Sequence, residues 1–153
     1  MIRPHLSALL LALTIVFPTG VLAQSNVFTA ETTDAEGIQL SVSNARLYWE
    51  EKIDETTFVP HEIRHVPVKH GAATINVKFQ QISKIMVKPD HPAKGRQALT
   101  IKLLNGKSGE FPLAKEVTLI GQSDFGEIRI PMKSLRSMTF SKKSQAKRSA
   151  KAP

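Results

Sequence analysis

Apolar and polar residues alternate with a period of two over most of the chain from Gly37 onward. This period places successive side chains on opposite faces of a β-sheet, so each alternating run predicts a strand with one buried face. The apolar positions of these runs are Ile38, Leu40 and Val42; Leu47 and Trp49; Val66 and Val68; Ile75, Val77 and Phe79; Leu99, Ile101 and Leu103; Val117 and Leu119; and Ile128, Ile130 and Met132. No run after residue 23 has sustained helical spacing, so the pattern predicts an all-β, antiparallel domain.

The turns between these runs have recognisable residues. Asn105-Gly106 follows the run that ends at Leu103, and both residues tolerate the positive φ angles of a tight hairpin. The acidic segment 50–57 (EEKIDETT) is turn-like, and the polar segment 24–36 is expected to be a flexible lead-in. These signals predict short connections between neighbouring strands.

The apolar pattern also occurs twice, at a constant offset of 53 residues. Six positions agree in class between the two copies: Ile75, Val77, Phe79, Ile82, Ile85 and Val87 match Ile128, Ile130, Met132, Leu135, Met138 and Phe140. The common unit is interpreted as strand, tight turn, strand, one helical turn and strand. A duplication explains the match, and so does coincidence in a β protein rich in Ile and Val. The expected architecture is a small antiparallel barrel or sandwich of about eight to ten short strands.

The N-terminus has the pattern of a secretory signal peptide. Arg3 supplies a positive charge, the stretch from Leu6 to Phe17 is uncharged and mostly apolar, and Val21-Leu22-Ala23 follows. This pattern predicts a signal helix with cleavage after Ala23 and therefore an exported, periplasmic or extracellular protein. An uncleaved N-terminal anchor is the alternative. No second apolar run of this size exists, so no transmembrane span is expected in the mature chain.

Composition narrows the functional classes further. The chain has no cysteine, which excludes disulfides, thiolate catalysis and Cys-based zinc sites. The net charge is +8, but five positive charges and no negative charge lie in the segment 141–153. These cations are Lys142, Lys143, Lys147, Arg148 and Lys151. The remaining body is nearly neutral, so nucleic acid is not an expected partner.

The tail 141–153 has no large apolar residue and is predicted to be disordered. It is interpreted either as a solubilising terminus or as a contact with a surface polyanion or anionic membrane. The expected organisation is therefore a signal peptide over 1–23, a lead-in over 24–36, one β domain over 37–140 and a basic tail over 141–153.

One short segment resembles an enzyme motif. His61-Glu62-Ile63-Arg64-His65 has the H-E-x-x-H pattern and resembles the zincin metalloprotease motif. The resemblance implies that His61 and His65 bind zinc and that Glu62 activates water. That chemistry requires a helix, which brings residues four apart onto one face.

The context of this segment favours a strand over a helix. Pro67 follows two residues after His65, and Val59, Val66 and Val68 favour an extended chain. An ordinary strand edge is therefore the preferred interpretation of the motif. A looser metal site that gathers His61, His65, His70 and His91 is a second alternative.

The residues thus favour a non-enzymatic binding or accessory module of the cell envelope. No set of residues combines suitable side chains with a plausible catalytic geometry, and no cofactor is implied. The expected partner is another envelope protein or a surface polyanion. Of the adjacent aromatics Tyr48 and Trp49, one is expected to pack in the core and the other to face outward. The alternatives are a metal-dependent function at His61 and His65, and polyanion binding through the tail.

Overall fold

The computed structural model describes residues 27–93 and 96–142, with the side chains of residues 89–93 not described. Eleven strands and two 3₁₀ turns follow one another along these residues. They are β1 (Phe28–Asp34), β2 (Gln39–Lys52), β3 (Phe58–Ile63), β4 (His65–His70), β5 (Ala73–Lys78), η1 (Phe79–Gln81), β6 (Ile82–Ala93), β7 (Arg96–Leu103), β8 (Ser108–Pro112), β9 (Thr118–Ser123), β10 (Gly126–Pro131), η2 (Met132–Ser134) and β11 (Leu135–Lys142). The prediction of an all-β fold is confirmed.

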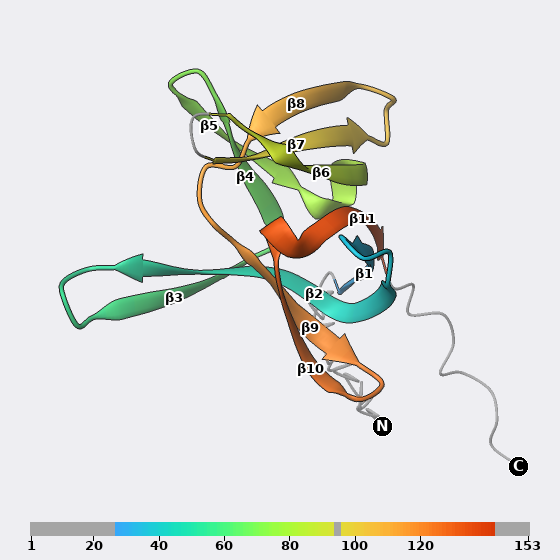
Figure 1. The fold of residues 1–153 in the computed structure, drawn as a ribbon, viewed down its shortest axis with the longest axis horizontal. Coiled ribbons are helices and arrows are strands. Elements are labelled where there is room, and N and C mark those ends of the chain that lie inside the picture. The colour runs from blue at the N-terminus through green and yellow to red at the C-terminus, as the bar shows by residue number, and fades with distance from the viewer. Residues whose placement is uncertain (1–26, 94–95, 143–153) are drawn as a thin grey trace, which may run out of the picture.

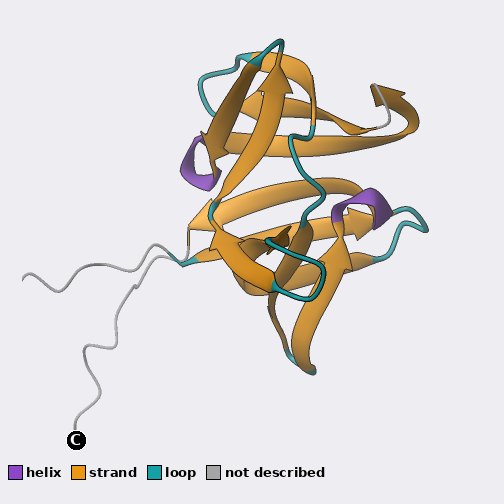
Figure 2. Ribbon diagram, turned by 90° about the vertical axis from the view of Figure 1, so that its left-hand side faces the viewer, coloured by secondary structure: helices purple, strands orange, loops and turns teal. Residues whose placement is uncertain are grey.

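The strands form a sandwich-like arrangement and not a closed barrel (Figures 1 and 2). Nine strands belong to one antiparallel sheet with the path β10-β9-β2-β1-β11-β6-β7-β8, to which β3 adds by pairing with β2. The remaining pair, β4 and β5, touches this sheet through an isolated bridge between Val68 and Leu113. In Figure 1, β4 to β8 gather in the upper half of the molecule, and β1, β2 and β9 to β11 gather below them.

Two predicted boundaries were wrong. The segment predicted as a flexible lead-in contains β1, which lies between β2 and β11 in the sheet. Its inward positions are Phe28, Ala30 and Thr32, and the buried Thr32 hydroxyl donates a hydrogen bond to the Leu40 carbonyl (3.1 Å). At the other end, Ser141 and Lys142 belong to β11 and pair with β1, so they are not part of a disordered tail. The described chain has eleven strands, one more than the upper end of the predicted range, and β1 is the strand that the prediction left out.

The internal repeat predicted from the sequence has the expected structure. β4, β5 and η1 recur as β9, β10 and η2, and every boundary is shifted by the same 53 residues. The hydrogen bonds recur as well, because Phe79 N donates to Arg64 O (3.2 Å) and Met132 N donates to Val117 O (3.0 Å). The two segments therefore adopt one shared local structure.

A second correspondence completes each copy. The β1–β2 turn and the β7–β8 turn match at an offset of 69 residues: Gly37 has a φ of 88° and Gly106 a φ of 87°. Asp34 N donates to Ile38 O (3.0 Å), and Leu103 N donates to Lys107 O (2.8 Å). We call β4 to β8 the first unit, and β9 to β11 together with β1 and β2 the second unit. The final hairpin of the second unit comes from the N-terminal end of the chain.

The two units meet around a local two-fold axis. β6 and β11 are equivalent strands and pair with each other, and Ile85 lies opposite Met138, its own counterpart at the 53-residue offset. Both side chains are fully buried. Around them lie the largest enclosed side chains of both units, which are Phe79, Leu47, Ile82, Leu99, Ile101, Leu119, Met132 and Leu135. One continuous core therefore holds the two units together.

The predicted signal peptide and cleavage site lie outside the described residues, as do Lys143, Lys147, Arg148 and Lys151 of the tail. Over the part of the chain that is described, no helix is long and apolar enough to cross a membrane.

Candidate functional site

The two units differ most in the connections that leave them. In the first unit, residues 114–117 lead from the Val68–Leu113 bridge directly into β9. The equivalent point of the second unit is Asn44, and twenty residues (45–64) separate it from β4. The extra sixteen residues form the far end of β2, a turn and β3. We call residues 50–60 of this insertion the arm.

The arm extends away from both units (Figure 1). β2 pairs with β9 only as far as Tyr48, and beyond this residue β2 and β3 pair only with each other. Every residue of the arm is exposed, including Ile53 (59%), Phe58 (52%) and Val59 (38%). The arm also carries Glu50, Glu51, Asp54 and Glu55 against the single cation Lys52. It therefore exposes three apolar side chains among four carboxylates, with Phe58 and Val59 on opposite faces because they are consecutive residues of β3.

The tip of the arm is an ordered turn. Asp54 Oδ1 accepts hydrogen bonds from the backbone amides of Thr56 (2.9 Å) and Thr57 (2.8 Å). These bonds, with the Thr56 amide as the largest cause, lower the pKa of the Asp54 carboxyl. Ile53 N closes the turn by donating to Thr57 O (3.0 Å). The tip thus remains negatively charged at neutral pH.

The base of the arm is fixed by Trp49. The imidazole of His61, the cross-strand neighbour of Trp49, stacks on the indole at a centroid distance of 4.3 Å and 10° between planes. Lys115 Nζ lies 3.2 Å from the indole centroid. The imidazole and the ammonium group would overlap if both lay on the same side of the ring at these distances, so they occupy opposite faces of the indole. His61 Nε2 also contacts Glu51 Oε2 at 2.9 Å.

The histidine motif does not have zincin geometry. His61 lies in β3, Arg64 is a bend, and His65 begins β4, so the segment is extended and the strand interpretation is confirmed. His65 is partly buried, which lowers the pKa of its imidazole. His70 packs edge-on against Phe111 (5.9 Å), and the side chain of His91 lies outside the described residues. Among the described side chains, no three His, Asp or Glu residues are grouped so that they could hold a metal ion.

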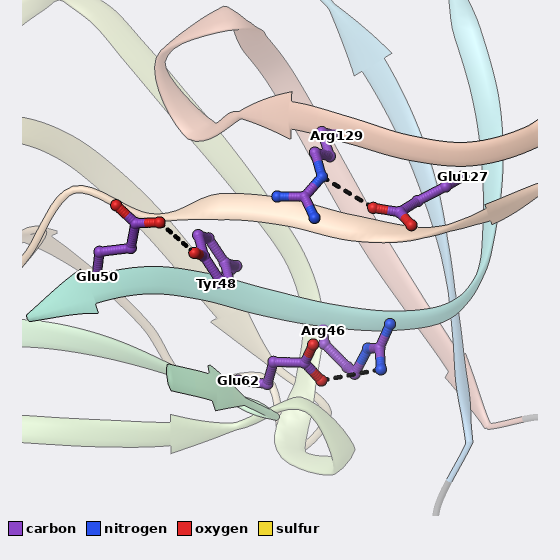
Figure 3. A network of polar contacts seen from close by, with 6 residues as sticks. All are labelled: Arg46, Tyr48, Glu50, Glu62, Glu127 and Arg129. Atoms are coloured by element: carbon purple, nitrogen blue, oxygen red, sulfur yellow. Dashed lines mark hydrogen bonds and ion pairs between the residues drawn. The ribbon is translucent and has the colours of Figure 1, made fainter. Parts of the chain in front are cut away.

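Polar side chains line the face of β2 opposite to Trp49 (Figure 3). Arg46 forms an ion pair with Glu62 (2.9 Å), and Arg129 pairs with Glu127 (2.8 Å) and lies 5.4 Å from the Tyr48 ring centroid. The Tyr48 hydroxyl donates to Glu50, and this bond is the main reason why the pKa of Tyr48 is raised. Trp49 packs against the core, whereas Tyr48 faces outward, as predicted for the two aromatics.

A cleft of about 810 Å³ opens at the base of the arm. Four separate segments form it: the end of β2, the start of β7, the connection 113–117, and the junction of β10 with η2. Its lining includes Trp49 with Lys115, and also Arg96, Gln97 and Lys133.

Sequence reasoning missed this site because its residues are far apart in the chain and share no motif. Of its polar and aromatic lining residues, only the adjacent aromatics Tyr48 and Trp49 were singled out.

A protein-family model described as "Uncharacterised protein" matches residues 25–143. The chain belongs to this family. The matched range contains all eleven strands, both units and the arm. No curated protein and no solved structure matches the chain significantly.

Proposed function

We propose that this protein is a non-enzymatic binding module, exported to the cell envelope, and that the arm is its contact with a partner protein. The observation that carries the proposal is the sixteen-residue insertion, which breaks the internal repeat and whose outer part, the arm, consists only of exposed residues. Exposed large apolar side chains on an element that the core does not need are typical of a surface that a partner covers. The arm therefore has a binding role that the fold itself does not require.

The chemistry of the arm defines the partner. Ile53, Phe58 and Val59 are exposed on the two faces of the arm and fit apolar recesses of a partner, and the four carboxylates beside them favour a rim of Lys and Arg. Pro60 lies within β3 and has no N–H to offer to an added strand, which disfavours strand addition at the β3 edge, and we expect the partner to contact a face of the arm. We therefore expect a folded partner with a basic, apolar surface.

The export half of the proposal rests on the N-terminal pattern, with Arg3, the apolar stretch and Val21-Leu22-Ala23. When the full chain is produced with its own leader in a Gram-negative bacterium, we expect the osmotic-shock fraction to contain protein that begins at Gln24. Intact-mass spectrometry of that fraction checks this. Protein of full-length mass in the cytoplasmic fraction would contradict export.

The arm contact is tested by site-specific photocrosslinking. A benzoylphenylalanine in place of Phe58 is expected to give one dominant adduct with a partner protein in producing cells of the native host. The matched control places the same residue at Phe125, which is also fully exposed (102%) but lies in the β9–β10 turn. Adducts at position 125 alone, or at neither position, would contradict the proposal.

Polyanion binding through the tail remains a prediction. Lys142 belongs to β11, and the other four cations lie outside the described residues. No structural observation favours this function over the arm contact.

A further inference from the structure

The cleft at the base of the arm has an excess of positive charge. Three cations, Arg96, Lys115 and Lys133, line it against the carboxylates Glu50 and Glu116. Glu50 accepts a hydrogen bond from the Tyr48 hydroxyl, so it is already partly engaged. The carboxylate contacts found among the described residues use other side chains: the cations Arg46, Lys88 and Arg129, and the imidazole of His61. The three cleft cations are therefore available to a ligand.

Lys115 already rests on an aromatic ring in the structure without a ligand. Its Nζ lies on the indole of Trp49, and His61 supports that indole from the other face. An unsupported lysine loses side-chain freedom when it binds an anion, and this loss weakens binding. The Trp49 face already restricts Lys115 and keeps its charge at the cleft, so part of that ordering precedes binding.

The volume and the lining define the class of ligand. A cleft of about 810 Å³ is in the range of small-molecule sites, which extends over roughly 300–1,000 Å³. Gln97 and Thr118 supply uncharged hydrogen-bonding groups beside the cations. We propose that the cleft binds a small organic anion, with its carboxylate or phosphate group between Lys115 and Lys133. This site shares only Glu50 with the arm, and its ligand does not depend on the proposed arm contact.

Trp49 is the only tryptophan of the chain, so its fluorescence reports directly on the cleft. The probes are digalacturonic acid for a carboxylate, glucose 1,6-bisphosphate for a phosphate, and maltose as a neutral molecule of similar size. We expect saturable changes in Trp49 emission with at least one of the anionic probes and none with maltose. The anion that binds more tightly identifies the preferred group. Raising the salt concentration from 0.05 to 0.5 M should weaken binding, because the cleft is open to solvent.

Two charge-neutralising variants and one control complete the test. Lys133→Gln and Lys115→Gln should each weaken binding of the anionic probe about tenfold, which equals ~1.4 kcal/mol. Lys102→Gln removes the same charge from an exposed position of β7 outside the cleft and should leave affinity unchanged. Because Lys115 contacts the fluorophore, its variant is also measured by calorimetry.

Three results would overturn the proposal. These are the absence of binding by both anions, equal binding of maltose, and an equal loss of affinity in Lys102→Gln. The last result would show that only the overall charge of the protein attracts anions. Because the arm crosslink at Phe58 is measured independently, failure here leaves the proposed arm contact untouched.

Discussion

Phe79→Ala is expected to destabilise the protein by about 3–5 kcal/mol, the range for removing a buried aromatic side chain. Phe79 is 1% exposed. Its ring stacks on Phe140 (4.0 Å between centroids) and meets Phe28 edge-on (5.8 Å), so it joins η1 to both β1 and β11. The loss combines the missing transfer free energy with the cavity left between η1, β1 and β11.

Urea unfolding followed by Trp49 fluorescence measures this loss. Phe125→Ala is the matched control, because Phe125 is fully exposed and its removal should change the free energy of unfolding by less than about 0.5 kcal/mol. If Phe79→Ala lost less than about 1 kcal/mol, the ring could not lie in the core that joins the two units.

Replacing the arm is expected to weaken partner binding at least about 100-fold while the fold remains stable. The variant substitutes Asn-Gly for residues 50–60, which places a two-residue turn between Trp49 and His61, an existing cross-strand pair. Because every residue removed is exposed, the free energy of unfolding should change by no more than about 1 kcal/mol. The ion pair between Glu51 and His61 is lost, but exposed pairs contribute only about 0–1 kcal/mol.

Much of the fold could be predicted because buried strands leave an alternating pattern. The strands around Ile75, Leu99 and Ile128 have one face in the core, so their apolar residues recur at every second position. The same reason made the repeat visible, since equivalent core positions keep apolar side chains. Asn105-Gly106 located its turn because Gly106 needs a positive φ.

The errors occurred where burial leaves no such pattern. The inward positions of β1 include the small Ala30 and the polar Thr32, and both looked like parts of a loose segment. The arm is exposed on both faces, so nothing in EEKIDETT distinguishes the end of β2 from the turn that follows it.

Gly121 shows a further limit of the pattern. Its counterpart in the first unit is Val68, but a Cβ at Gly121 would lie 2.5 Å from Val42 Cγ1 and 2.6 Å from Ser43 O. The second unit needs glycine there because β2 approaches closely where its chain bends at Asn44, the one non-glycine residue with positive φ in the described chain. This close approach depends on the tertiary structure, and a single sequence does not reveal it.

The cleft was unpredictable for a similar reason. Trp49, Arg96, Lys115 and Lys133 come from four segments, and each is an ordinary residue in its local sequence. Only the meeting of the two units brings them together. The histidine motif is the opposite case, because its spacing suggested a site that the extended backbone of β3 does not form.

The affinity of the arm-replaced protein for the partner recovered from the Phe58 adduct tests the central claim most directly. Isothermal titration of that partner with the natural chain and with the arm-replaced chain supplies both dissociation constants. The account predicts that affinity falls at least about 100-fold, or ~2.7 kcal/mol, while both proteins unfold at similar urea concentrations. Equal affinity in a folded arm-replaced protein would contradict it, because the arm would then be dispensable for binding.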